Sequence, residues 1–147
     1  SDHPAVKCQR IPMKTVCIMS EGNTLGKKKF ITPEDLINEP MIHSRRDSAF
    51  YRKLEEVFTL HNVKINSWIE TRQFNSACML VAEGRGVSIV SEMDAREYES
   101  RGLIIKPFRP VIPHTLMLVR PKHTALSTIA LEFLDFFESS LEPFRLK

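Results

Sequence analysis

The sequence lacks the cysteine pattern of a disulfide-bonded or zinc-binding domain. It contains three cysteines, Cys8, Cys17 and Cys78, and none of them lies in a C-x-x-C pair. A disulfide framework or a zinc site would need an even count or closely spaced pairs. We therefore expect reduced thiols, no metal ligands and a cytoplasmic location.

Long apolar runs and a signal peptide are absent as well. No segment approaches the ~20 apolar residues that span a bilayer. The opening segment SDHPAVKCQR is polar and lacks both a hydrophobic stretch and an initiator methionine. We therefore expect no membrane partner and no secretory signal, and the missing methionine favours a fragment or a processed chain.

A strong excess of charge of one sign is also missing. The formal net charge is +3, and the basic residues are scattered except for Lys27–Lys29, which we interpret as a solvated loop. This balance does not predict nucleic-acid binding by the chain itself. With 147 residues, 42% apolar and 27% charged, the composition is that of one globular domain or two small lobes.

Motifs of catalysis are absent. There is no G-x-S-x-G, no H-E-x-x-H and no glycine loop that could cradle a phosphate, and the histidines lack the spacing of metal ligands. Cys78 falls on the apolar face of a predicted helix, where a thiol is usually buried and inert. We expect recognition without catalytic residues or a cofactor. A small enzyme that uses Cys78 or a histidine remains an alternative, which rapid labelling of that thiol would favour.

The most informative segment that is present runs from Ile65 to Ser91. Apolar side chains recur at helical spacing from Phe74 to Val81, between two strand-like runs. Gly84 suits the left-handed end of that helix, and Gly86 lets the next strand start closely packed. A strand–helix–strand unit predicts parallel pairing, and open sheets of this kind bind ligands at the carboxyl ends of their strands.

The remaining pattern extends this unit into an α/β order. Further strands are predicted at 5–10, 13–19, 40–44, 64–70, 103–108 and 115–120, and helices after Thr32, from Asp47 or Ser48 onward, and from 126 to 141. Ser127 or Thr124 is available to cap the last helix. The order predicts one α/β lobe over roughly 38–106, with flanking segments that belong to a second, incomplete lobe.

Polar side chains gather where the strand at 40–44 runs into a helix. The residues at this junction are Ser44, Arg45, Arg46, Asp47 and Ser48. Free amides and the helix dipole attract an anion there, and hydroxyls and an arginine would add donors for a carboxylate. An ordinary N-cap flanked by exposed arginines explains the same residues. After the next strand, Glu70 could accept from an amino group, and Thr71 could cap the following helix.

These ordered pieces resemble the effector-binding (substrate-binding) domain of LysR-type transcriptional regulators. ITPEDLINEPMI resembles the entry into the second lobe of that family, and FYRKLEEVFTLHNVKINSWIET resembles its first helix and next strand. ACMLVAEGRGVSIVS is similar to the signature LVAAGxGVxxxP, with Ser91 where proline is usual. GLIIKPF, TLMLVRPKHTALS and FLDFFESSL resemble the return crossing and terminal helix. SRRDSAFYRKLEEVF is most similar to members that respond to amino acids or opines.

The resemblance implies a periplasmic-binding-protein-like α/β fold. It implies one complete parallel-sheet lobe, the second regulatory lobe at 38–106, and an incomplete first lobe. Residues 1–37 would be the end of lobe one and a crossing, and 107–147 the return crossing and terminal helix. The DNA-binding domain and part of lobe one would lie outside this chain. Redox-sensing members carry a cysteine in the first loop; Ala49 stands there, so we do not expect peroxide sensing.

The function that the resemblance implies is the sensing of a small effector. A carboxylate ligand, an amino acid or opine, would contact Ser44–Ser48, with Arg45 or Arg46 on the carboxylate, Glu70 on the amine and Glu70-Thr71 as a supporting wall. Homodimers or homotetramers are expected, and DNA would be reached only through the absent domain. The alternative is an extracytoplasmic solute-binding protein of a transport system, which would use a similar fold.

Overall fold

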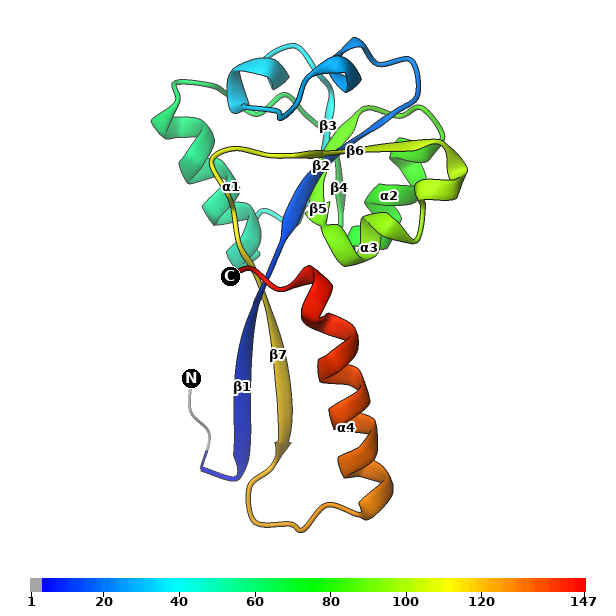
Figure 1. Ribbon diagram of the computed structural model, residues 1–147. Helices are drawn as coiled ribbons and strands as arrows, with labels where there is room; N and C mark the ends of the chain where they lie inside the picture. Colours follow the sequence, from blue (N-terminus) through cyan, green and yellow to red (C-terminus); the bar gives the residue numbers. More distant parts are fainter. Residues whose placement is uncertain (1–3) are drawn as a thin grey trace. The chain divides into compact units, whose positions relative to one another are not determined.

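The computed structural model describes residues 4–147, which form two compact units. The larger unit is Lys14–His114, and the smaller unit combines the residues up to Met13 with Thr115–Lys147. The chain therefore starts in the smaller unit, builds the whole larger unit and then returns to the smaller one (Figure 1).

A five-stranded mixed sheet forms the centre of the larger unit. Its order is β4-β3-β5-β2-β6, and its strands are β2 (Thr15–Ser20), β3 (Met41–Ser44), β4 (Ser67–Thr71), β5 (Val87–Ser91) and β6 (Leu103–Pro107). β3 runs parallel to both β4 and β5 and lies between them. The two strands of the predicted strand–helix–strand unit, β4 and β5, therefore share a direction but do not pair with each other. β2 is antiparallel to its neighbours β5 and β6.

Helices cover both faces of this sheet (Figure 1). α1 (Ala49–Leu60) and α2 (Phe74–Ala82) each follow a parallel strand, and α3 (Glu92–Arg96) follows β5. The apolar face of α1 packs with Cys17 and Met19 of β2 in one core cluster. The apolar face of α2 packs with Val16 and Ile18 in another. Alternate β2 residues therefore face opposite layers, as the period of a strand requires.

Short 3₁₀ helices complete this unit: η1 (Thr24–Lys27), η2 (Pro33–Leu36) and η3 (Glu99–Arg101). The helix expected after Thr32 is thus a single 3₁₀ turn. The backbone N–H of Thr32 donates to Asp35 Oδ2 at 2.9 Å, which ties the start of this turn to its own acidic residue.

The turn from α2 into β5 has the predicted glycine geometry. Gly84 has a φ of +86°, and Gly86 has a φ of +83°. A Cβ atom on Gly86 would lie only 2.4 Å from the carbonyl oxygen of Pro40. That same oxygen accepts a hydrogen bond from Val87 N at 2.9 Å. Gly86 therefore permits the close approach that starts the β3–β5 pairing.

β2 belongs to the larger unit although it lies before residue 38. The sequence predicts the end of lobe one and a crossing at 1–37 and a parallel-sheet lobe at 38–106, whereas the larger unit runs from Lys14 to His114 and its sheet includes the antiparallel strand β2. Five successive side chains of β2, Thr15 to Met19, are buried. This burial suits a central strand, which has neighbours on both sides. Burial of this kind does not reveal which neighbours a strand has or in which direction they run.

The smaller unit contains a two-stranded sheet and one long helix. The strands are β1 (Val6–Met13) and β7 (His114–Pro121), drawn in opposite directions in Figure 1, and the helix is α4 (Thr128–Leu141), followed by η4 (Glu142–Phe144). Ser127 caps α4 as predicted, since its hydroxyl accepts from Ala130 N at 3.1 Å. β1 runs through Ile11-Pro12, where the sequence analysis places a break. Proline is tolerated in a strand at the edge of a sheet.

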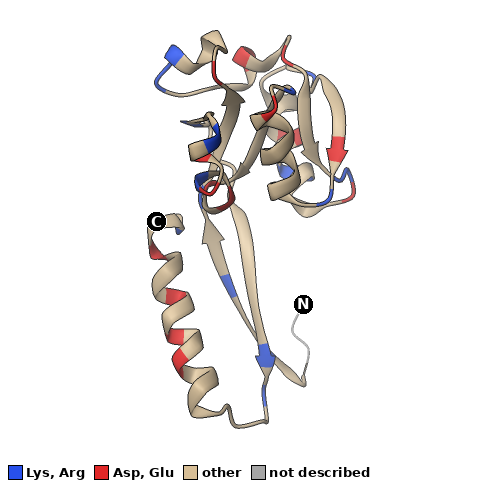
Figure 2. Ribbon diagram, turned by 90° about the vertical axis from the view of Figure 1, so that its right-hand side faces the viewer, with Lys and Arg blue, Asp and Glu red and all other residues tan. Residues whose placement is uncertain are grey.

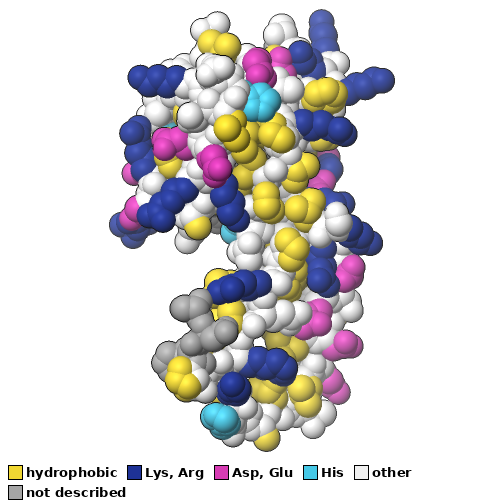
Figure 3. Space-filling view, turned by 90° about the vertical axis from the view of Figure 1, so that its left-hand side faces the viewer, with side chains coloured by type: hydrophobic (Ala, Val, Ile, Leu, Met, Phe, Trp, Pro, Cys, Tyr) yellow, Lys and Arg dark blue, Asp and Glu magenta, His cyan; other side chains and the backbone are white. Residues whose placement is uncertain are grey.

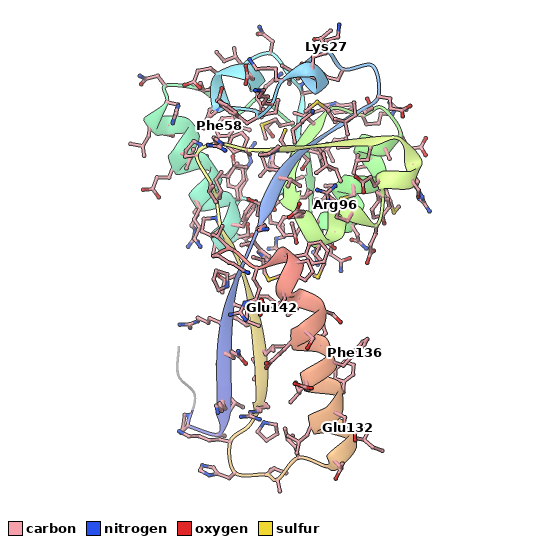
Figure 4. All side chains as sticks on the ribbon, viewed as in Figure 1. Lys27, Phe58, Arg96, Glu132, Phe136 and Glu142 are labelled. Carbon is pink, nitrogen blue, oxygen red and sulfur yellow. The ribbon has the colours of Figure 1, made fainter. Side chains whose placement is uncertain are left out.

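α4 carries apolar side chains on more than one face. Leu141 is buried, but Ile129, Phe133 and Phe136 are 62–78% exposed, and Phe136 points away from the strands in Figure 4. Acidic residues are spread along α4 itself, which contains no lysine or arginine (Figure 2). The apolar side chains of α4 are therefore only partly covered within residues 4–147.

None of the helices that residues 4–147 form is long and apolar enough to cross a membrane.

Candidate functional site

Two helices begin side by side at one edge of the sheet. β3 and β4 are parallel neighbours, and Ser44 at the end of β3 pairs with Thr71 at the end of β4. α1 starts five residues after the end of β3, and α2 starts three residues after the end of β4. The amides in the first turn of each helix have no partner within the helix, and the helix dipoles are positive there. This edge is therefore suited to an anion.

Ser48 caps α1, as the junction pattern predicts. Its hydroxyl accepts from Tyr51 N at 3.1 Å and donates to the carbonyl oxygen of Arg45 at 2.6 Å. Ser48 N also donates to Arg45 O, at 2.9 Å. These bonds hold the loop between β3 and α1 in one tight turn.

The start of α2 differs from the prediction. Its N-cap is Gln73, which makes no side-chain capping bond. Thr71, which we expected to cap this helix, donates its hydroxyl to Gln73 O at 3.3 Å. Thr71 lies two residues before the N-cap, so its oxygen does not reach the amides of the first turn. Within residues 4–147 no side chain caps those amides.

A hollow of about 440 Å³ opens at this edge, and we call it the helix-end hollow. It is lined by Ser44, Arg45, Ser48, Phe50, Arg72, Gln73, Phe74, Asn75, Asp94 and His114. The set combines hydroxyl and amide groups, charges of both signs and aromatic rings. Such a mixture of apolar surface and a few placed polar groups is typical of a small-molecule site.

Three aromatic rings form a wall of the helix-end hollow. Phe50 and Phe74 meet edge to face with ring centroids 5.2 Å apart, and His114 meets Phe74 in the same way at 4.9 Å. Burial lowers the pKa of His114, and the positive charge of Lys53 lowers it further. The imidazole is therefore neutral at neutral pH, and the wall is uncharged.

The charged residues of the helix-end hollow offer partners for both signs. The Arg45 guanidinium is exposed and pairs with Asp47 at 2.6 Å, while Arg72 makes no ion pair within the described chain. Asp94 is partly buried, and its pKa is raised, first by that burial and then by the nearby Glu97. A ligand with a carboxylate and an amino group would find complementary charges here.

The structure separates the predicted contact residues into two groups. Ser44, Arg45 and Ser48 line the helix-end hollow, and Asp47, Arg46, Glu70 and Thr71 do not. The backbone N–H of Arg46 donates to Glu70 Oε1 at 2.8 Å, and the Arg46 guanidinium donates to Ser67 Oγ at 3.1 Å. Glu70 therefore stabilises the loop between β3 and α1 and does not line the helix-end hollow. The Arg46 side chain lies against Ser67 and does not line this hollow either.

Seven of the ten lining residues do not belong to the predicted set: Phe50, Arg72, Gln73, Phe74, Asn75, Asp94 and His114. Phe50 and Phe74 lie in the first turns of α1 and α2, so their position near the helix ends could be predicted from the sequence. Asp94 in α3 and His114 at the start of β7 are brought in by the fold. Nothing in the local sequence connects them to Ser44.

The two buried thiols, Cys17 and Cys78, are not available as nucleophiles. Cys78 and Cys17 are fully buried. Burial raises the pKa of Cys17 and raises that of Cys78 to about 12, so both remain protonated thiols. Within residues 4–147, no group of three or more His, Cys, Asp or Glu side chains could hold a metal ion. The groups that line the helix-end hollow are therefore suited to binding a small ligand.

Comparison with known sequences gives a consistent result. A family model described as LysR substrate binding domain matches residues 2–142. The chain is 30% identical over 135 residues to the transcriptional activator protein LysR of Escherichia coli K12, which covers 92% of this chain and 43% of that protein. It is 27% identical over 133 residues to the regulatory protein NocR of Agrobacterium tumefaciens T37, covering 90% and 44%. The chain thus spans less than half the length of these relatives.

Solved structures share the fold. A putative LysR family regulator from Pseudomonas aeruginosa superposes with a TM-score of 0.75 at 17% identity, covering 97% of this chain and 51% of that chain. The effector binding domain of QuiR in complex with shikimate gives 0.69 at 17%, covering 99% and 70%. The regulatory domain of Synechocystis CcmR in complex with 2-PG gives 0.67 at 20%, covering 96% and 71%. At these identities the likeness concerns the fold alone.

Proposed function

Because this chain belongs to the LysR substrate binding domain family, we propose that it senses a small effector for a LysR-type transcriptional regulator. The relatives that it matches are named as a transcriptional activator and a regulatory protein, not as enzymes. In this proposal the regulator works in the cytoplasm as a homo-oligomer and contacts DNA through a domain outside the chain.

The observation that carries the proposal is the convergence of two helix starts on the helix-end hollow. Within residues 4–147 no side chain caps the first turn of α2, and the Ser44 hydroxyl lines the same hollow, whereas the Ser48 hydroxyl already donates its proton to Arg45 O. Arg45 and Arg72 add positive charge at the same edge. Amides, hydroxyls and guanidinium groups together favour a carboxylate. QuiR, which shares the fold, is solved with shikimate, which is itself a carboxylate.

The rest of the hollow favours an effector that also carries an amino group, such as an amino acid or an opine. Asp94 supplies a carboxylate for an ammonium group, and the Phe50–Phe74–His114 wall supplies apolar surface for the carbon chain. Asp94 therefore takes the role predicted for Glu70, which is contact with the amino group of the ligand. Glu70 already accepts a hydrogen bond from Arg46 N. Effector binding would shift the population of regulator conformations by its differential affinity for them.

Titration calorimetry with a panel of amino acids and opines tests the proposal. Arg72→Gln removes one charge from the hollow without touching the cap of α1, and the loss of a charge-assisted hydrogen bond should weaken binding about tenfold or more. Arg52→Gln is the matched control, because Arg52 is exposed on α1 and does not line the hollow. Asp94→Asn should weaken amino acids while sparing the corresponding deaminated acids. Equal affinities for all variants would refute the site.

A further inference from the structure

A second hollow, of about 970 Å³, lies along α1 and the segment that connects it to β4; we call it the α1 hollow. Buried side chains form its floor, among them Tyr51, Phe58 and Val63. Three amides stand among its lining residues: Asn38, Asn62 and Asn66. The α1 hollow and the helix-end hollow share no lining residue.

Positive charge in the α1 hollow exceeds negative charge. Arg46 and Lys64 line it, and neither forms an ion pair with any residue of the described range 4–147. The single acidic lining residue is Glu55, which lies close enough to Tyr51 to raise the pKa of that phenol after burial has raised it first. Figure 3 shows the face that carries α1, with basic side chains projecting around it.

Arg46 is held in position before any ligand arrives. Glu70 Oε1 accepts from its backbone N–H, and Ser67 Oγ accepts from its guanidinium at 3.1 Å. Ser67 Oγ also bonds the ring Nε2 of the buried His43 at 2.6 Å, and the other ring nitrogen bonds Ser44 O at 2.8 Å. The exposed bond to Ser67 restricts the guanidinium only in part, and its remaining N–H groups match the two oxygens of a carboxylate or phosphate.

We propose that the α1 hollow is a second binding site, for a small organic anion. Arg46 and Lys64 meet the charged group, which is a carboxylate or a phosphate ester. The amides of Asn62 and Asn66 bond polar substituents, and the apolar floor contacts the carbon body. The inference does not depend on the effector proposal. The sequence pattern places Arg46 on the effector carboxylate, whereas in this proposal Arg46 binds a different anion in the α1 hollow.

Amide NMR of the 147-residue chain tests this site with two probes, sodium succinate and inorganic phosphate, at constant ionic strength. We expect saturable shifts at residues 62–67 with at least one probe, and the responding probe identifies the anion class. Arg46→Gln should weaken that binding about tenfold. Lys64→Gln should also weaken it, and Arg52→Gln, on α1 but outside both hollows, should leave it unchanged.

The proposal is overturned if neither probe gives saturable shifts, or if Arg46→Gln and Arg52→Gln behave alike. Arg72→Gln separates it from the effector proposal, because Arg72 lines only the helix-end hollow. This variant should keep the succinate or phosphate response at 62–67. Loss of that response in Arg72→Gln would also contradict a separate site.

Discussion

Replacing Gly86 by alanine should destabilise the larger unit far more than replacing Gly84 by alanine. Both glycines have a positive φ, +86° at Gly84 and +83° at Gly86, so both variants force alanine into the left-handed region. They differ in what surrounds the new methyl group. At Gly84 nothing lies within 4 Å, whereas at Gly86 the Cβ would lie 2.4 Å from Pro40 O. Gly84→Ala is therefore a control for the φ effect.

The magnitudes follow from these contacts. The left-handed conformation costs alanine ~1–2 kcal/mol, and reduced freedom of the unfolded chain offsets ~0.4–1 kcal/mol, so Gly84→Ala should cost ~0–1.6 kcal/mol. Gly86→Ala must also displace Pro40 O, which accepts from Val87 N at 2.9 Å. Losing that bond costs about 1 kcal/mol and the overpacking ~1–3 kcal/mol, so the excess over Gly84→Ala should be ~2–4 kcal/mol.

Urea unfolding followed by circular dichroism and by the fluorescence of Trp68 measures both variants. Trp68 is the only tryptophan of the chain, and a Cβ on Gly86 would lie 3.5 Å from its ring. Its emission therefore reports on the affected contact. If Gly86→Ala is no less stable than Gly84→Ala, the close approach of Pro40 does not constrain the β3–β5 pairing, and the reasoning fails.

Two further predictions concern thiols and pH. A thiol reagent should modify Cys8 quickly in the native chain and leave the buried Cys17 and Cys78 unmodified until unfolding, and fast labelling of three thiols would contradict the packing. Burial raises the pKa of Asp35, but Lys28 and Thr32 outweigh it, and the pKa is lowered overall. Asp35 therefore stabilises the fold above its unfolded pKa of about 3.9, and this stability disappears as pH falls through the lowered folded value. Asp35→Asn should flatten the acid limb of a Tm–pH curve, and an unchanged limb would refute the assignment.

Local signals allowed much of the fold to be predicted. The α1 start at Ser48, the α2 register and the turn at Gly84 and Gly86 each depend on caps, helical spacing or backbone conformation within a few residues. The neighbours of β2 could not be read in this way. Five successive buried residues indicate a central strand, but the pairing with β5 and β6 depends on residues about 70 to 90 positions further along the chain.

The candidate site was predictable only in part, for a similar reason. Ser44 and Ser48 are adjacent to the strand end that the pattern predicts, and they line the helix-end hollow. Asp94 and His114 reach it from α3 and β7 through the topology. The Arg46 side chain does not line the helix-end hollow, because its guanidinium donates to Ser67 Oγ, 21 residues further along the chain.

A crystal structure of the chain with the tightest-binding amino acid or opine from the calorimetric panel tests the central claim most directly. The effector proposal predicts the ligand carboxylate at the first turns of α1 and α2, within hydrogen-bond distance of Ser44 or Arg72. It also predicts the ammonium group beside Asp94. The same ligand bound instead in the α1 hollow, or bound with its carboxylate turned away from both helix starts, would contradict it.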